Sequence, residues 1–354
     1  MKKDTLFDEA VQLLCRLIAL PSVSRQEAQA ADALQEYMES HGLAPLRRGN
    51  NLLCTPPDFD PARPTILLNA HIDTVKPVAG WTKDPFRPLI EGDRLYGLGS
   101  NDCGGGLVSL LMTYRTLTAR PQACNFLYLA SCEEEVSGKN GIELMLPELP
   151  ATPAAALVGE PTGMQPAIAE KGLMVIDGTA HGKSGHAARN EGINAIYQAL
   201  PDLLWLQSYR FPKESPLLGP VKMTVTQINA GTQHNVIPDV CTFVVDVRSN
   251  EMYSNEELFS LISAHVGSEL HARSFRLSSS SLPASHPIVQ RAEALGRTPF
   301  GSPTLSDQAL MRFPSLKMGP GQSERSHTAD EFILLSEIKE ALGLYEALLD
   351  GLTL

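Results

Sequence analysis

The 354-residue sequence lacks the features of a membrane, nucleic-acid-binding or disulfide-stabilised protein. No apolar run approaches the roughly 20 residues that a transmembrane helix needs. No long run of Lys or Arg is present, and the formal net charge of −11 argues against nucleic acid or an anionic membrane as a partner. None of the six cysteines belongs to a Cys-x-x-Cys pair, so we expect reduced thiols in a cytoplasmic protein.

The N-terminal segment, residues 1–25, also lacks the apolar stretch of a secretory signal. Its leucines recur at helical spacing, but acidic and basic residues interrupt them. The sequence contains no internal repeat and no low-complexity segment. A hydrophobic content of 43% and a charged content of 19% are ordinary for a soluble globular protein, and the length allows more than one domain.

What the sequence does contain is an alternation of short apolar strands with helices. Strands are predicted at residues 65–71, 125–130, 154–158 and 315–318. Helices are predicted at residues 25–41, 107–119, 141–146, 288–295 and 336–349, with a further one in the N-terminal segment. This alternation predicts an α/β fold with a doubly wound, mostly parallel sheet.

The pattern changes between residues 173 and 284. Strands are predicted at 175–180, 221–228 and 241–247, and helices at 193–208 and 255–269. Strands with two helices predict a compact α+β domain inserted into the first one. Residues 1–172 and 285–354 would then form the α/β domain, and residues 173–284 the inserted domain.

Histidines and acidic residues follow the predicted strands or lie in a glycine-rich loop beside them. In open α/β sheets, the ligand crevice lies outside the carboxyl ends of the strands. Any one such residue is easily explained as a solvated side chain, but their recurrence at five places predicts a site. The five places are His71, Asp102, Glu134 with Glu135, Glu160, and His327.

These residue types suit zinc or a similar divalent metal, because imidazole and carboxylate groups occur together without cysteine. Two histidines and three carboxylates can hold two ions if one carboxylate bridges, and a further carboxylate can act as a base. Asp73, two residues after His71, can accept the second ring N–H of that histidine and fix its tautomer.

Two nucleotide-binding motifs are excluded by spacing. Gly97-x-Gly99 begins like a dinucleotide fingerprint, but Asp102 occupies the position of the third glycine. The segment 178–184 resembles a P-loop, but its glycines are one residue too close together, and Asp177 stands where a glycine is needed.

The motifs resemble those of the co-catalytic di-zinc amidohydrolases, a family that includes acetylornithine deacetylase, succinyl-diaminopimelate desuccinylase and glutamate carboxypeptidase. The resemblance covers nearly the whole chain. It is carried by His71-Ile-Asp73-Thr-Val, Leu95–Asp102 and Gly159-Glu160-Pro161-Thr162. Three further motifs are most similar to the acetylornithine deacetylase branch: Trp81–Phe86, Tyr96–Gly99, and Gly319-Pro-Gly321 followed by His327–Phe332.

The resemblance implies a set of metal ligands. Asp102 would bridge two divalent ions, zinc in the first place, with cobalt or manganese as alternatives. The peptide bond from Asp102 to Cys103 would be cis. One ion would add Glu135 and His327, and the other His71 and Glu160.

The resemblance also implies catalytic and substrate-binding roles. Glu134 would be the general base, and Asp73 would orient His71. The inserted domain would be a lid and dimerisation domain, making the protein a homodimer. Its His186 would stabilise the oxyanion, often across the dimer, while Asn235 and Arg248 would bind a substrate carboxylate.

The chain departs from the family pattern at two places. Glu133-Glu134-Glu135 stands where the family usually has Asp-Glu-Glu, and Cys103-Gly104-Gly105 stands where it often has Met-Lys-Gly. Counting back from Gly141 aligns the family's Asp-Glu-Glu with these three residues, and the resemblance then implies Glu134 as base and Glu135 as ligand.

The implied function is hydrolysis of an Nα-acyl amino acid in arginine biosynthesis, with acetyl or succinyl carried on ornithine or citrulline. A second carboxylate, as in succinyl, could be bound by Lys83, Lys171, Arg189 or Arg325. The alternatives are a desuccinylase-like deacylase, a di- or aminopeptidase of the same family, and a metal-free binding protein on the same scaffold.

Overall fold

The computed structural model describes residues 3–189 and 191–354. The chain forms two compact units. The first comprises Met1–Ile168, Ser281–Phe300 and Ser306–Leu354, and the second comprises Ala169–Ser280 and Gly301–Leu305. The predicted domain limits, 173 and 284, lie close to the limits of the second unit, but the short segment Gly301–Leu305 was not predicted. Assignment of these units as separately folding domains stays a prediction.

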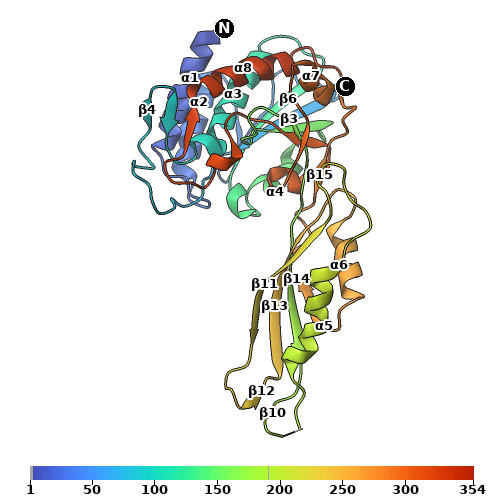
Figure 1. Cartoon of the computed structure of the whole chain (residues 1–354). Helices are drawn as coiled ribbons and strands as arrows, with labels where there is room; N and C mark the ends of the chain where they lie inside the picture. Colours follow the sequence, from blue (N-terminus) through green and yellow to red (C-terminus); the bar gives the residue numbers. More distant parts are fainter. Residues whose placement is uncertain (1–2, 190) are drawn as a thin grey trace. The chain divides into compact units, whose positions relative to one another are not determined.

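The first unit is built on a nine-stranded sheet (Figure 1). Its strands are β1 (Leu46–Arg48), β2 (Asn51–Cys54), β3 (Thr65–His71), β6 (Asn125–Ser131), β7 (Ala155–Val158), β8 (Ala167–Glu170), β15 (Ser280–Ser281), β16 (Phe300–Ser302) and β17 (Ser315–Lys317). The order is β1-β2-β6-β3-β7-β17-β8-β15, with β16 paired to β8. The central strands β6, β3, β7 and β17 run parallel, whereas β1, β2 and β8 pair antiparallel with their neighbours. The predicted α/β fold class is confirmed.

Helices cover both faces of this sheet, which explains why its central strands are buried along their whole length. They are α1 (Lys3–Ile18), α2 (Ala28–Ser40), α3 (Gly105–Thr118), α4 (Ile142–Met145), α7 (Pro287–Ala294) and α8 (Leu335–Leu349). Ile66 and Leu68 of β3 pack with α1, α3 and α8 in one core, and Leu67 between them is buried on the other face. Figure 1 shows α4 on that second side of the sheet.

A small antiparallel sheet brings the C-terminal part of the chain to the glycine-rich loop. Its strands are β4 (Leu89–Glu91), β5 (Arg94–Tyr96) and β18 (Phe332–Leu334), in the order β18-β5-β4. Phe332 pairs with Tyr96, so the residues that precede β18 lie beside those that follow β5. This pairing carries His327 towards the loop that contains Asp102.

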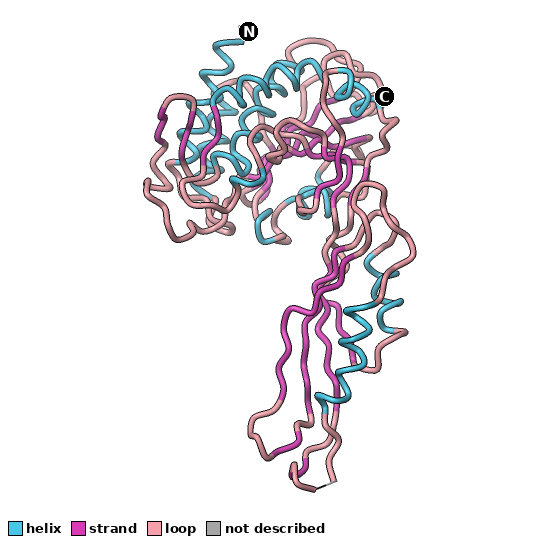
Figure 2. The backbone as a smooth tube through the Cα atoms, in the orientation of Figure 1, coloured by secondary structure: helices cyan, strands magenta, loops and turns pink. Residues whose placement is uncertain are grey.

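The second unit is an antiparallel sheet in the order β11-β13-β9-β14, with two helices packed against it (Figure 2). Its elements are β9 (Met174–His181), α5 (Ala195–Ser208), β11 (Lys222–Ala230), β13 (Val240–Arg248), α6 (Asn255–Ser263) and β14 (Glu269–Ala272), with a short pair formed by β10 (Gly185–His186) and β12 (Val236–Ile237).

The prediction of one helix over residues 255–269 was wrong beyond Ser263. The chain turns at Gly267 and Ser268, whose N–H groups donate to the Asp202 carboxylate of α5 at 2.9 and 2.8 Å. The strand β14 then begins at Glu269.

Among the described residues, no helix combines the length and the apolar character that a membrane span requires.

Candidate metal and catalytic site

His71 lies at the carboxyl end of β3 and is almost fully buried, with 2% of its surface exposed. Its Nε2 atom is 3.2 Å from Oδ1 of Asp102 and 3.6 Å from Oε1 of Glu160. Burial acts to lower the pKa of this imidazole, but the neighbouring Cys103, Asp102 and Glu134 outweigh it, so the pKa lies well above its ordinary value. The Nε2 atom thus faces two carboxylates.

Asp102 lies between the two predicted histidine ligands. Its Oδ1 atom faces His71, and its Oδ2 atom is 3.6 Å from Nε2 of His327. The peptide bond from Asp102 to Cys103 is cis, as the resemblance implies. The Glu331 carboxylate accepts the N–H groups of Gly99, Asn101 and Asp102, at 3.1, 2.9 and 3.0 Å, and so holds this loop in place. A carboxylate with one oxygen towards each histidine has the geometry of a bridging ligand.

Glu135 and His327 form a second close pair, with 2.9 Å between Oε2 and Nε2. This hydrogen bond raises the pKa of His327 to about 9, against the opposing effect of burial. Glu135, His71 and Asp102 place one ligand atom each within 4.8 Å of one another. The two ends of the site are therefore joined through the Asp102 carboxylate.

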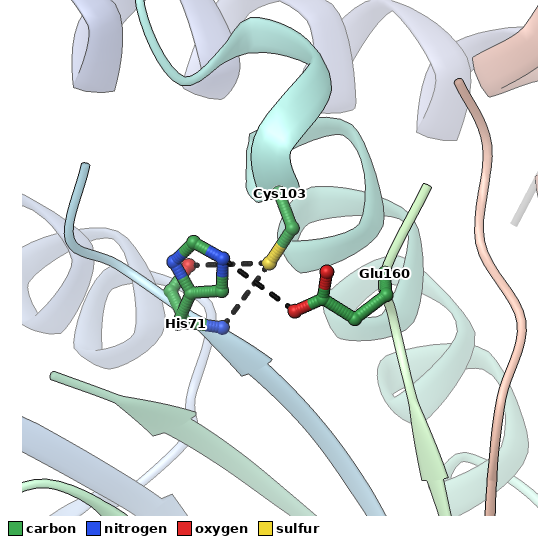
Figure 3. Close-up of side chains that lie close together, drawn as sticks. All are labelled: His71, Cys103 and Glu160. Carbon is green, nitrogen blue, oxygen red and sulfur yellow. Dashed lines mark hydrogen bonds and ion pairs between the residues drawn. The ribbon is translucent and has the colours of Figure 1, made fainter. Parts of the chain in front are cut away.

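Glu160 follows β7 and points towards His71 and Cys103 (Figure 3). Its Oε1 atom is buried and has no hydrogen-bond partner within the described residues. Burial, with the nearby charge of Asp102, raises the pKa of Glu160 to about 8. A buried carboxylate oxygen without a donor is costly, and a cation would compensate that cost. His71, Cys103 and Glu160 also place one ligand atom each within 4.8 Å of one another, and the Cys103 thiol accepts the backbone N–H of His71 at 3.2 Å.

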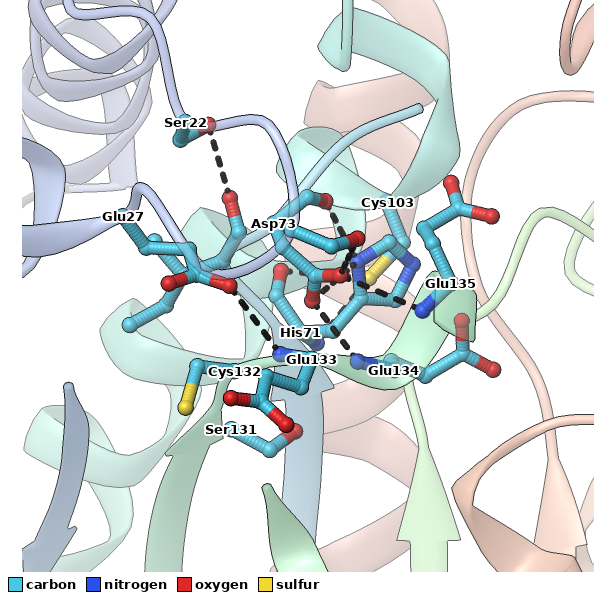
Figure 4. A network of polar contacts seen from close by, with 12 residues as sticks. Ser22, Glu27, His71, Asp73, Cys103, Ser131, Cys132, Glu133, Glu134 and Glu135 are labelled. Atoms are coloured by element: carbon cyan, nitrogen blue, oxygen red, sulfur yellow. Dashed lines mark hydrogen bonds and ion pairs between the residues drawn. The ribbon is translucent and has the colours of Figure 1, made fainter. Parts of the chain in front are cut away.

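The segment from Glu133 to Glu135 turns sharply after β6. Glu133 has a φ of 55°, and a short 3-10 turn follows at Glu134–Val136. The Glu133 side chain accepts a hydrogen bond from Nδ2 of Asn140 at 2.8 Å and extends away from Glu134 and Glu135 (Figure 4). Burial raises the pKa of Glu134 well above its ordinary value, and the charge of Glu160 acts in the same direction. The turn therefore separates Glu133 from the two neighbours that were assigned to the site.

The converging imidazole and carboxylate groups could hold metal ions, and the comparison with known families supports such a site. The model described as "Peptidase family M20/M25/M40" matches residues 67–351. The chain belongs to this family. It is therefore a metallohydrolase that acts on amide bonds, and the resemblance stated from the motifs is confirmed.

Named relatives of this M20-family chain include two deacylases. Acetylornithine deacetylase of Proteus mirabilis is 27% identical over 380 residues, which cover 97% of each chain. Succinyl-diaminopimelate desuccinylase of Corynebacterium glutamicum is 27% identical over 365 residues, covering 96% of this chain and 95% of that one. Among solved structures, the Bacillus subtilis YXEP protein, described as a dinuclear metal-binding peptidase of the M20 family, has a TM-score of 0.71 at 19% identity and 98% coverage of both chains.

Asp73 of the M20-family chain makes contacts that differ from the expected ones. Nδ1 of His71 bonds to the main-chain oxygen of Asp73 at 2.8 Å, whereas the Asp73 carboxylate is 3.7 Å away. That carboxylate accepts the backbone N–H groups of Glu134 and Glu135, at 3.0 and 3.1 Å. Because the chain bends after His71, the Asp73 carbonyl group reaches the His71 ring, and the Asp73 side chain reaches the turn at Glu133–Glu135.

Asp307 is a buried carboxylate near the site that the sequence analysis did not identify. Its Oδ2 atom accepts the Ser131 hydroxyl at 2.6 Å, and Ser131 pairs with His71 in the sheet register. Burial raises the pKa of Asp307 to about 6. Asp307 follows a loop rather than an apolar strand, so the pattern that marked the other site residues was absent.

The remaining predicted residues lie in the second unit. His186 in β10 pairs with Val236 in β12, and the main-chain oxygen of Asn235 accepts the N–H of Ala187 at 3.0 Å. The structure thus brings His186 and Asn235 onto neighbouring segments. Arg248 ends β13, and its Nε and Nη2 atoms donate to the Asp246 carboxylate at 2.8 and 3.0 Å. The roles of these three residues stay predictions.

Proposed function

We propose that this M20-family hydrolase removes the acyl group from an Nα-acyl amino acid, with N-acetylornithine as the first candidate and arginine biosynthesis as the setting. The observation that carries the proposal is the Asp102 carboxylate between His71 and His327, with the half-buried Glu134 beside it. Similarity to an acetylornithine deacetylase along nearly the full chain supports the choice of substrate class.

We infer that the site holds two divalent ions, zinc in the first place. Asp102 would bridge them, Glu135 and His327 would complete one site, and His71 and Glu160 the other. The converging oxygen and nitrogen donors and the unpartnered Oε1 of Glu160 support this assignment. When bound, such ions lower the pKa of a water molecule and polarise the carbonyl group of an amide.

The protein's own groups would then carry the proton. Glu134 would accept a proton from the attacking water and return it to the leaving nitrogen as the C–N bond breaks. Its raised pKa suits a group that must hold a proton between these two events. His186 would donate to the developing oxyanion, and Arg248 with Asn235 would bind the substrate carboxylate. The products would be a carboxylic acid and a free amino acid.

Two of the four candidate partners for a second carboxylate already contact an acidic side chain, whereas Lys171 contacts the Pro220 oxygen at 3.2 Å. Of the candidate partners for a second carboxylate, Arg325 forms two hydrogen bonds with Glu337, at 2.7 and 3.1 Å. Lys83 is 3.2 Å from Glu91. Arg325 and Lys83 would have to leave an existing partner to bind a succinyl carboxylate, which makes acetyl the first candidate. Desuccinylase-like activity nevertheless remains the second candidate, because the desuccinylase relative covers the chain almost as fully.

We propose that the protein is a cytoplasmic homodimer joined through the inserted domain. Strand β11 forms an edge of its sheet, and Ile228 on that strand is 51% exposed. An exposed edge strand with apolar side chains is a surface that proteins cover or pair. Pairing with the same edge of a second copy would give a closed two-fold dimer.

The decisive experiment measures kcat/KM for acetyl and succinyl groups on ornithine and on citrulline, with a panel of dipeptides beside them. We expect N-acetylornithine to be hydrolysed with the highest kcat/KM. A dipeptide that exceeds every acyl amino acid would replace the proposal with the peptidase function. Purified protein that binds no zinc, cobalt or manganese in metal analysis would favour the metal-free binding protein.

A further inference from the structure

The loop ahead of α2 contacts the segment that follows β3, although it supplies none of the proposed ligands. Thr74 donates its N–H to the Ser22 oxygen at 2.9 Å, and Ser24 donates its own N–H to the Thr74 oxygen at 3.1 Å. The Ser22 hydroxyl donates to the main-chain oxygen of Ile72 at 3.1 Å. Val23 and Thr74 form a parallel bridge, so the loop lies alongside residues 72–74 like a short added strand.

Two carboxylates accept the three successive backbone N–H groups of the turn at Glu133–Glu135. Glu27 accepts from Glu133 at 3.3 Å, and Asp73 accepts from Glu134 and Glu135 at 3.0 and 3.1 Å (Figure 4). We call these two carboxylates the amide clamp. The Ser24 hydroxyl donates to Oδ2 of Asp73 at 2.6 Å, so the loop ahead of α2 supports both halves of the clamp.

Glu27 is a fully buried carboxylate, with 0% of its surface exposed. Besides Glu133, it accepts hydrogen bonds from the backbone N–H of Arg25 at 2.5 Å and from Nδ2 of Asn50 at 3.0 Å. Burying an ionised carboxylate is costly unless several donors satisfy it, and charge-assisted hydrogen bonds are stronger than neutral ones. Glu27 is therefore a buried carboxylate held by several hydrogen-bond donors, not a surface side chain.

The turn needs such support because its backbone is unfavourable. Glu133 adopts a φ of 55°, which costs a residue with a side chain about 1 kcal/mol or more. In a relaxed, extended chain, the side chains of Glu134 and Glu135 would point to opposite sides. Only the hydrogen-bonded turn allows the side chains of Glu134 and Glu135 to reach one site.

We propose that Ser24 and Glu27 are positioning residues that fix the turn carrying Glu134 and Glu135. The assignment of those two as base and ligand rests on the proposed function. The contacts of the amide clamp do not depend on it, because they involve only backbone N–H groups and buried oxygens. The two ideas can therefore be tested apart.

The first experiment measures hydrogen–deuterium exchange of the peptide covering residues 131–137 in chelator-treated protein without substrate. Ser24→Ala and Glu27→Leu should speed exchange there about tenfold, because each removes hydrogen bonds to a charged group. Ser24→Thr keeps the hydroxyl, and Glu27→Gln keeps one oxygen for the two backbone donors, so both should restore slow exchange. Ser40→Ala and Glu39→Leu make the same changes at the other end of α2 and serve as controls.

Unchanged exchange at residues 131–137 in Ser24→Ala would overturn the proposal, even if Glu27→Leu failed to fold. The second readout is kinetic and uses whichever amide the wild type hydrolyses best. Displacement of the Glu134 and Glu135 side chains should lower kcat about tenfold and leave KM unchanged. A raised KM with normal kcat would also overturn the proposal. If no acyl amino acid is hydrolysed, the proposed substrate is wrong, and the exchange experiment still decides the role of the clamp.

Discussion

Replacing the three glutamates after β6 one at a time should separate their roles. In Glu134→Gln the side chain keeps its shape but can no longer accept a proton. The backbone contact from Glu134 to Asp73, at 3.0 Å, does not involve the side chain and should persist. We therefore expect metal content near that of the wild type. We expect kcat to fall by about a hundredfold to ten-thousandfold, the range for loss of a general base.

Glu135→Gln should act on the metal instead. Its Oε2 atom is 2.9 Å from Nε2 of His327 and within reach of Asp102, so the change removes the charge of a proposed ligand at the centre of the site. Loss of a group that merely supports a ligand lowers metal affinity about tenfold to a hundredfold. Loss of a direct ligand should therefore lower metal affinity by at least as much. Excess zinc should partly restore activity.

Glu133→Gln provides the comparison within the same turn. Its carboxylate contacts Asn140 rather than a proposed ligand, and an amide can keep one of those hydrogen bonds. We expect a loss of about 1 kcal/mol in stability and a change in kcat of less than tenfold. The assays are metal content by mass spectrometry after gel filtration and kcat at saturating substrate. Metal loss in the Glu134 variant with a full complement in the Glu135 variant, or an inactive Glu133 variant, would refute the assignment.

Three further outcomes are expected. Arg248→Lys should lower kcat/KM at least about tenfold, because a lysine loses the two-pronged contact with a carboxylate; wild-type behaviour of this variant and of Arg248→Ala would rule the role out. Mixing inactive His186→Ala with inactive Glu134→Gln should restore about a quarter of wild-type activity if His186 acts across a dimer, and no recovery despite proven subunit exchange would show that it does not. In chelated protein, Glu160 and His327, with pKa values near 8 and 9, hold protons that the unfolded chain releases at lower pH. The folded state then binds more protons, so Tm should fall as pH rises from 5.5 to 8.5, and the Tm gained on adding zinc should grow with pH; a Tm that rises with pH without metal would contradict this.

Residues at the ends of apolar strands were predictable from the sequence, because an apolar run stops there and a histidine or an acidic residue follows it. The strand ending at His71 and the strand preceding Glu133 are buried on both faces, so apolar residues dominate them and polar residues mark their ends. The assignment of Glu134 and Glu135 needed family motifs as well, since three similar side chains stand together. The turn at Glu133 then accounts for how two consecutive residues reach one site.

Other features could not be predicted, because they depend on contacts between distant segments. Glu27 precedes α2 and Asp307 begins a short 3-10 helix, and nothing in their local sequence marks them as buried. The contact from Nδ1 of His71 to the carbonyl group rather than the carboxylate of Asp73 depends on how the chain bends after β3. Only four residues separate Ala264 from the start of β14, because Asp202, on another helix, holds the intervening turn. Local propensity carries no information about such partners.

The position of β17 has a consequence for the order in which the chain can fold during synthesis. This strand, residues Ser315–Lys317, is inserted between β7 and β8, which are made some 150 residues earlier. A nascent chain that has not yet reached residue 315 therefore has an open gap in the middle of its sheet, with the unpaired edge of β7 exposed. It also lacks His327, so only one of the two histidines is present. We expect closure of the sheet to await the synthesis of β17, and ribosome-bound chains ending before residue 315 to need protection from aggregation.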